Sequence, residues 1–73
     1  MAEIRVKSEI AGSVWKLLKQ PGEAVEAEES LLLLESMKME IPVFAPRHGT
    51  ILEYRVAEGD TVAEGDVVVV LRA

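Results

Sequence analysis

Short segments in which apolar and polar residues alternate follow one another along the chain. Residues 3–7 (EIRVK) show the two-residue period of a strand with one buried face. Residues 13–19 (SVWKLLK) form a second predicted strand. It runs into Pro21 and Gly22, which are the residues that a type II turn favours at its second and third positions. A brief strand is predicted at residues 24–25, so the chain opens as short strands joined by tight turns.

The second half of the chain repeats the first half at a spacing of 37 residues. Gly49 and Gly59 each follow a glycine of the first half by this distance, and the apolar run 31–34 aligns with 68–71. Four leucines alone are compatible with a helix or a strand, whereas the valine-rich run 68–71 favours a strand. Because repeated segments occupy equivalent places in one core, both runs are predicted to be strands. Residues 1–73 are therefore predicted to form one all-β domain, a flattened eight-stranded barrel-sandwich hybrid of two pseudo-symmetric four-strand halves.

A hairpin at residues 35–40 (ESMKME) joins the two halves and carries Lys38 near its centre. The repeat aligns Lys38 with Met1, so both chain ends are expected at the end of the domain opposite this lysine. Pro42 follows in the next strand, and because proline has no N–H for the ladder, it predicts an edge strand or a bulge. The hairpin is therefore expected to project one lysine away from the chain ends.

The alignment of the two halves also characterises three other residues. Glu28 stands where the second half has Gly65, and a left-handed backbone at this turn would strain a glutamate. Trp15 aligns with Leu52, which predicts a packing role for the indole ring. His48 precedes a glycine in a loop and is expected to be an ordinary surface histidine. None of the three is assigned a chemical role.

Composition and charge narrow the classes of function. The chain has 73 residues, no cysteine, one histidine and a formal net charge of −5. Without cysteine, disulfides and thiolate zinc sites are excluded; one histidine cannot build a transition-metal site, so no metal ligands are predicted. Scattered basic residues in an acidic chain disfavour nucleic acid and anionic membranes as partners. No leader-like segment opens the sequence and no apolar run approaches the roughly 20 residues of a membrane span, so we expect a cytoplasmic protein.

The tripeptide Met37-Lys38-Met39 carries a more specific signal. Preceded by LES and followed by EIPV, it resembles the biotin attachment site of biotinyl carrier domains, the biotin carboxyl carrier protein family of biotin-dependent carboxylases. The resemblance extends from about Ile4 to Leu71. Lipoyl carrier domains are similar in fold but typically have Asp-Lys-Ala at this place, which favours biotin over lipoate.

The chain departs from the family pattern in two places. The connection at residues 20–23 (QPGE) has no room for the protruding thumb that some bacterial acetyl-CoA carboxylase carriers insert there, so the chain resembles the thumbless type. Carriers of this type belong to pyruvate, propionyl-CoA, methylcrotonyl-CoA and urea carboxylases, or are small free-standing attachment proteins. The family's Ala-Pro-Met-Pro-Gly-like loop is replaced by residues 8–12 (SEIAG), which puts the contacts of that loop in doubt.

The resemblance implies that a biotin protein ligase attaches biotin to Lys38 through an amide bond. The arm would then carry an activated carboxyl group from a biotin carboxylase to a carboxyltransferase, and catalysis would belong to these partners. The chain is accordingly expected to be a monomeric carrier rather than an enzyme, with no catalytic residues of its own. A lipoyl or dual biotin/lipoyl carrier, with lipoate on Lys38, is the main alternative. An unmodified interaction module is the third.

Four residues beside Lys38 have two interpretations each. Met37 and Met39 are either flexible apolar fill near the hairpin or contacts for the ligase and the carboxylase sites. The main interpretation of Glu35 and Glu40 is that they are solvated charges, and the second is that they are contacts for docking of the ligase. Because side chains alternate along a hairpin, the ligase should recognise the position of the lysine as well as its identity.

Overall fold

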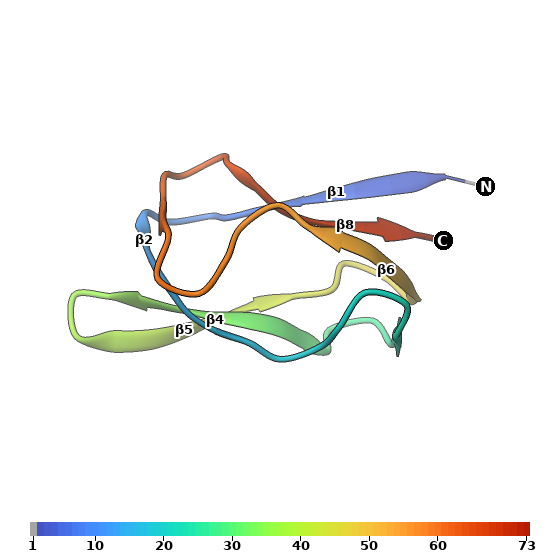
Figure 1. Cartoon of the computed structure of the whole chain (residues 1–73), viewed down its shortest axis with the longest axis horizontal. Helices are drawn as coiled ribbons and strands as arrows, with labels where there is room; N and C mark the ends of the chain where they lie inside the picture. Colours follow the sequence, from blue (N-terminus) through green and yellow to red (C-terminus); the bar gives the residue numbers. More distant parts are fainter. Residues whose placement is uncertain (1) are drawn as a thin grey trace.

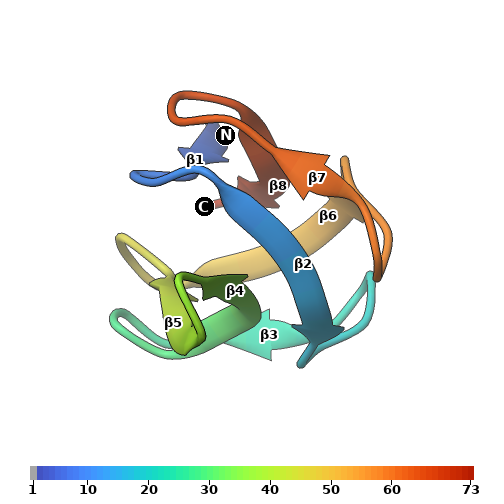
Figure 2. The same ribbon diagram turned by 90° about the vertical axis from the view of Figure 1, so that its left-hand side faces the viewer.

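Two four-stranded antiparallel sheets form a sandwich in the computed structural model, which describes residues 2–73 (Figures 1 and 2). These residues form the strands β1 (Glu3–Lys7), β2 (Gly12–Leu17), β3 (Ala24–Val25), β4 (Ser30–Ser36), β5 (Met39–Phe44), β6 (Gly49–Tyr54), β7 (Thr61–Val62) and β8 (Val67–Arg72). One sheet has the order β1-β8-β6-β3 and the other β5-β4-β2-β7, so each sheet combines strands from both halves of the chain. The part of the chain described contains no helix that is long and apolar enough to cross a membrane.

The predicted all-β class is confirmed as a sandwich of two sheets that do not close into a barrel. Within residues 2–73 no strand pairing joins one sheet to the other. On one side the edge strands are β1 and β5, and β5 contains Pro42, which lacks the N–H that a further ladder would need. On the other side β3 and β7 have only two residues each. The prediction of an edge strand at Pro42 is confirmed.

The register of the strands reproduces the 37-residue repeat. Val14 lies opposite Leu34 in the β2–β4 pair, and Ile51 lies opposite Leu71 in the β6–β8 pair. A bulge follows Val14 and Ile51 alike. The two halves are therefore related by a pseudo-two-fold axis that maps β1 onto β5 and β4 onto β8.

The core lies between the sheets and is built mainly from the two apolar runs that the repeat aligns. Both runs lie in strands with a neighbour on each side, since β4 is between β5 and β2 and β8 is between β1 and β6. Each fully buried leucine or valine contributes roughly 1.5–3 kcal/mol to the stability of the fold. The prediction that both runs are strands is confirmed. Their fully buried residues are Leu31, Leu32, Leu34, Val68, Val69 and Leu71.

Trp15 does not pack into the core, so the predicted packing role is wrong. The residue retains 48% of its accessible surface, whereas its neighbour Val14 retains 2%. Side chains alternate between the two faces of a strand, so Trp15 lies on the outer side of β2 next to the inward-facing Val14, and the bulge between Val14 and Lys16 leaves Lys16 exposed beside it. There the Lys16 ammonium lies 5.8 Å from the centroid of the indole ring, within range of a cation–π contact.

Four turns of the same construction occur at residues 20–23, 26–29, 57–60 and 63–66. In each turn the N–H of the fourth residue donates to the carbonyl of the first. The N–H of the first residue donates in return to the side-chain carboxylate of the fourth, at 2.6–2.9 Å. The repeat relates these turns in pairs, so the connections obey the same pseudo-symmetry as the strands.

The third residue of each turn has a left-handed backbone. It is a glycine in three turns, where Gly22, Gly59 and Gly65 have φ angles of 94°, 95° and 90°. In the fourth turn it is Glu28, with a φ angle of 68°. The predicted equivalence of Glu28 and Gly65 is confirmed, and the glutamate adopts a conformation that L-residues rarely take.

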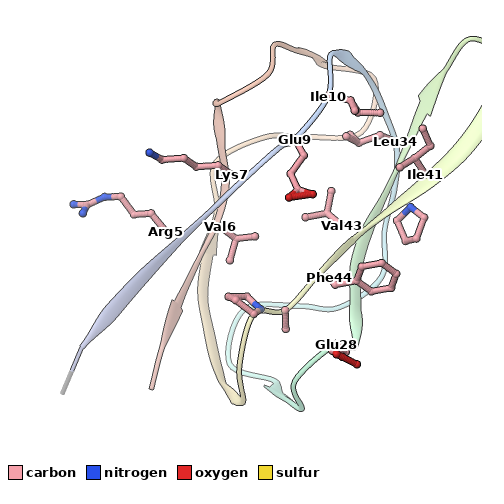
Figure 3. A pocket seen from close by; sticks show the side chains of 13 residues that line it. Arg5, Val6, Lys7, Glu9, Ile10, Glu28, Leu34, Ile41, Val43 and Phe44 are labelled. Atoms are coloured by element: carbon pink, nitrogen blue, oxygen red, sulfur yellow. The ribbon is translucent and has the colours of Figure 1, made fainter.

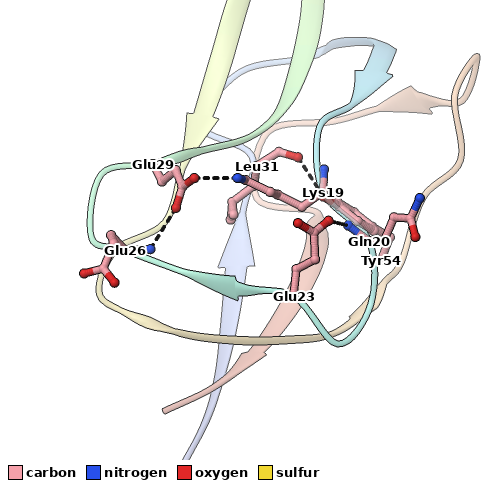
Figure 4. Close-up of polar contacts among 7 residues, drawn as sticks. All are labelled: Lys19, Gln20, Glu23, Glu26, Glu29, Leu31 and Tyr54. Atoms are coloured by element: carbon pink, nitrogen blue, oxygen red, sulfur yellow. Dashed lines mark hydrogen bonds and ion pairs between the residues drawn. The ribbon is translucent and has the colours of Figure 1, made fainter.

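The Tyr54 hydroxyl joins the second half of the chain to the first (Figure 4). It donates to the Leu31 carbonyl at 2.7 Å and accepts a hydrogen bond from the Lys19 N–H at 3.2 Å. Burial raises the pKa of Tyr54, so the neutral, hydrogen-bonded phenol is favoured. Lys19 is further held by an ion pair with Glu29, whose hydrogen bond raises the pKa of the lysine. One side chain thus connects β6 to the end of β2 and the start of β4.

The two ends of the described chain lie together, opposite the β4–β5 hairpin (Figure 1). Glu3 pairs with Arg72 at the end of the β1–β8 ladder, and the Ala73 N–H donates to the Ala2 carbonyl at 3.0 Å. The predicted position of the ends is therefore confirmed for Ala2 and Ala73. Met1, which the repeat aligns with Lys38, lies outside the described residues.

Replacing Glu28 with glycine is expected to stabilise the domain by roughly 1 kcal/mol, because glycine has no Cβ to strain in the left-handed region. Urea unfolding measures the change. Glu64→Gly removes a glutamate one position earlier in the related turn, where φ is not positive, and should give no stabilisation. A lower unfolding midpoint for Glu28→Gly would show that the glutamate is unstrained.

Tyr54→Phe is expected to destabilise the domain by about 1–3 kcal/mol, since the Leu31 carbonyl and the Lys19 N–H both lose their partner. The wild-type hydrogen bond needs the neutral phenol. Because the pKa of Tyr54 is raised in the fold, its contribution is complete below about pH 10 and disappears as pH rises through the folded value. Urea unfolding of both proteins from pH 7 upward checks this. Equal stabilities at pH 7 would contradict it.

Candidate functional site

Lys38 lies at the tip of the β4–β5 hairpin (Figures 1 and 2). Ser36 pairs directly with Met39, so the connecting loop consists of Met37 and Lys38 alone. Their φ angles are 52° and 66°. Two successive positive φ angles in a two-residue hairpin loop are the mark of a type I′ turn.

Methionine and lysine are poor residues for this turn. The preferred pairs are Asn-Gly and Asp-Gly, because asparagine, aspartate and glycine tolerate the left-handed backbone. For other L-residues this backbone costs roughly 1–2 kcal/mol each. The ladder beneath the turn, in which Leu34 pairs with Ile41 and Ser36 with Met39, holds Met37 and Lys38 in place. Methionine and lysine at these two positions do not favour the turn. Their presence is explained by the side chains that they expose to solvent.

The three residues of the Met-Lys-Met tripeptide are all exposed. Met37 retains 91% of its accessible surface and Met39 retains 63%, and Lys38 also lies open to solvent. The methionines therefore do not fill the core, and the interpretation as apolar fill is wrong. Their role as contacts for a partner stays a prediction.

Glu35 and Glu40 lie directly opposite each other at the base of the turn, and both are exposed. Like charges in directly opposed positions destabilise a sheet. The ion pairs found within residues 2–73 involve neither of these glutamates. Two carboxylates therefore form an acidic site beneath Lys38. A cationic surface of a partner protein would neutralise it, but ligase docking by Glu35 and Glu40 stays a prediction.

The start of β2 lies directly against the base of the hairpin, and the loop that precedes it is tied together by its own hydrogen bonds. A Cβ added to Gly12 would lie 2.7 Å from the Glu35 carbonyl oxygen, so the two backbones are in direct contact. The Ser8 hydroxyl is buried, donates to the Ile10 carbonyl at 2.5 Å and accepts from the Ile10 N–H at 3.3 Å. The turn therefore projects from a fixed base.

The exposed primary amine of Lys38 is the group that defines the chemistry of this tip. Across residues 2–73 there is no cluster of three or more histidine, cysteine or acidic side chains that could hold a metal. His48 is exposed in the loop before β6, in the surface position expected for it. The geometry suits covalent attachment of a carboxylic acid to the lysine, because a rigid two-residue tip presents the amine to another protein.

The family model for biotin/lipoyl domains, described as "Biotin-requiring enzyme", matches residues 4–71. The chain belongs to this biotin/lipoyl family. The match agrees with the predicted extent of the resemblance, from about Ile4 to Leu71.

Relatives of this biotin/lipoyl domain include biotin and lipoyl proteins. It is 44% identical over 66 residues to the Biotin/lipoyl attachment protein of Bacillus subtilis (strain 168), covering 90% of each chain. It matches the crystal structure of the Kluyveromyces lactis urea carboxylase with a TM-score of 0.94 and 32% identity, covering 99% of this chain and 6% of that one. It is 42% identical over 60 residues to the dihydrolipoyllysine-residue acetyltransferase component of the Pseudomonas aeruginosa pyruvate dehydrogenase complex, covering 82% of this chain and 11% of that protein. Family and fold are therefore shown, and the relatives include proteins named for biotin and for lipoate.

Sequence reasoning missed two features of the site. It treated Glu35 and Glu40 separately and did not predict that they face each other. With a two-residue turn at Met37 and Lys38, Ser36 pairs with Met39, so the next pair outward is Glu35 with Glu40. It also gave no role to the loop at residues 8–12, which departs from the family pattern yet lies against the hairpin.

Replacing Met37 with asparagine and Lys38 with glycine is expected to stabilise the domain by about 1–2 kcal/mol, because Asn-Gly suits a type I′ turn. Thermal or urea unfolding measures the gain. Lys38→Arg, which keeps the strained backbone, should leave the stability close to that of the wild type. If the double variant unfolded as easily as Lys38→Arg, the turn would not be strained.

Proposed function

We propose that this domain is a biotin carboxyl carrier. Lys38 is biotinylated by a biotin protein ligase, and the arm carries a carboxyl group from a biotin carboxylase site to a carboxyltransferase site. The observation that carries the proposal is the exposed Met37-Lys38-Met39 tripeptide at the tip of a strained, rigid hairpin in a domain of the biotin/lipoyl family.

Two observations favour biotin over lipoate. The lysine has a methionine on each side, whereas lipoyl domains typically have aspartate and alanine at these places. The match to urea carboxylase covers nearly the whole chain, with a TM-score of 0.94. The lipoyl relatives support a lipoyl or dual-specificity carrier as the second candidate, because they match at similar identity.

In this function the residues of the chain would orient the Lys38 amine for the partner enzymes, and those enzymes would catalyse the reactions. The ligase would remove a proton from the Lys38 ammonium, and the Nζ amine would attack the carbonyl of a ligase-bound biotinyl-adenylate. The amide bond forms as the acyl–phosphate bond breaks, and AMP leaves. The fixed backbone at the tip means that little conformational entropy is lost when the ligase binds it. Once attached, the cofactor supplies the nitrogen that accepts the carboxyl group. The tether keeps this nitrogen at high effective concentration near both partner sites.

The acidic pair below the tip gives the ligase a second feature to recognise. Glu35 and Glu40 lie on the two strands that flank the lysine and are exposed on the same hairpin. A ligase with basic residues around its active site would bind this end of the molecule in preference to other exposed lysines, such as Lys7 and Lys16. Position and charge together would then select Lys38.

Intact mass spectrometry after co-expression with a biotin protein ligase and excess biotin tests the proposal. We expect a single biotinyl adduct on the wild type and none on Lys38→Arg. A variant with Met37→Lys and Lys38→Met keeps the composition and the net charge but moves the amine by one position, and it should be labelled poorly. If the folded wild-type domain carried no biotinyl adduct but was modified by a lipoate ligase, the biotin proposal would be wrong. The lipoyl carrier would then be the supported function.

A further inference from the structure

A cavity of about 650 Å³ opens between β1 and β5, the edge strands of the two sheets (Figure 3). It exists because the sandwich is not closed on this side. The pseudo-two-fold axis relates the two bounding strands, but their surroundings differ. The hairpin with Lys38 extends from one end of the cavity, and the chain ends lie at the other end of the molecule (Figure 1).

The cavity is lined largely by apolar residues, and of the two carboxylates at its border, those of Glu9 and Glu28, that of Glu9 is directed into it (Figure 3). Val6 and Val43 face each other across it, and Ile10 and Ile41 are half-buried at the end nearest the hairpin. The Glu9 side chain points into the space between the two valines (Figure 3). The cavity therefore offers an apolar surface and a hydrogen-bond acceptor within it.

Arg5 and Lys7 also border the cavity, but their side chains point away from it (Figure 3). Their charges therefore do not offset the carboxylate of Glu9 inside the cavity. An occupant that matches this interior has apolar faces and N–H donors, and carries no negative charge.

The modified side chain of Lys38 is long enough to reach this cavity. Ile41 is three residues from Lys38 along β5, which is about 10 Å in an extended strand. Biotinyl-lysine has about eleven covalent bonds between Cα and the bicyclic ring, or roughly 13 Å at the advance per bond of an extended chain. An arm folded back along the hairpin would thus place its ring beside Ile10 and Ile41.

We propose that this cavity holds the ring of the biotin arm while the arm is not bound in a partner's active site. The proposal rests on the proposed function, since it concerns the cofactor on Lys38. The ring packs its apolar face against Ile10, Ile41 and Val43. A ureido N–H donates to the Glu9 carboxylate, so the neutral ring and the acceptor are complementary in hydrogen bonding.

The tether and the edge strands favour this occupant over a peptide from another protein. A short flexible tether produces an effective concentration in the millimolar range, so even a weak site is populated by its own arm. A peptide strand added along β5 would find no ladder donor at Pro42. Along β1 it would meet the alternating charges of Glu3, Arg5 and Lys7, which discourage pairing at a sheet edge.

Proton NMR of the biotinylated domain tests the proposal. We expect nuclear Overhauser contacts between the ring protons and the methyl groups of Ile10, Ile41 and Val43. In Glu9→Ala the ratio of held to free arm should fall about tenfold, the value of one hydrogen bond to a charged acceptor. Glu64→Ala removes an exposed carboxylate in the turn before β8 and should leave the contacts unchanged.

The two measurements distinguish failure of the cavity proposal from failure of the carrier proposal. If mass spectrometry shows the adduct and the ring makes no contact with the isoleucines, the arm is free and the cavity proposal is overturned. Equal contacts in Glu9→Ala and wild type would overturn it as well. If no ligase modifies Lys38, a Lys38→Cys variant carries biotin on its single thiol through an iodoacetyl linker, since the chain has no other cysteine. The same contacts are then sought, with an iodoacetamide-capped sample as the control.

Discussion

The burial of two apolar runs between the sheets is the constraint on which the rest of this domain depends. Most leucines of β4 and most valines of β8 are buried, in strands that have a neighbour on each side, while Leu33 and Val67 are half-buried. Two of the four matching turns, at residues 26–29 and 63–66, lead directly into these strands and return the chain to the same core. The second half of the chain repeats this arrangement about the pseudo-two-fold axis and completes the core between the sheets.

Most of the residues with a locally unfavourable backbone or charge arrangement lie near the Lys38 end of the molecule. Met37 and Lys38 hold a left-handed backbone without glycine, and Glu35 and Glu40 place like charges opposite each other. Neither feature contributes to the stability of the fold, and the core does not require either one. Local rules are typically broken where a surface is used, so under the proposed function these residues mark the end that would meet the partner proteins. Glu28 is the exception, because its strained turn lies away from Lys38.

Most of the fold could be predicted from the sequence, because the repeat resolved what local patterns left open. The four leucines of β4 were ambiguous until aligned with the valines of β8. Trp15 was placed wrongly because its repeat partner Leu52 was taken as a core residue, whereas Leu52 is only half-buried and follows the inward-facing Ile51 as Trp15 follows Val14. The Tyr54 hydroxyl bonds and the cavity beside Glu9 depend on how the two sheets lie relative to each other, which no local sequence pattern contains. The position of Lys38 on the hairpin between the two halves was predictable from the repeat.

The elongated shape gives the domain a mechanical property. Its extents are 36 × 18 × 18 Å, and the lysine and the chain ends occupy opposite ends of the long dimension (Figure 1). Ala2 and Ala73 are hydrogen-bonded to each other, so polypeptide continued from either end would leave from the same point. Under the proposed function, the body would act as a stiff extension between a point of attachment at the chain ends and the cofactor on Lys38. Rotation about that point would sweep the reactive group over an arc whose radius includes nearly the whole length of the domain, so a short linker would suffice to serve two distant sites.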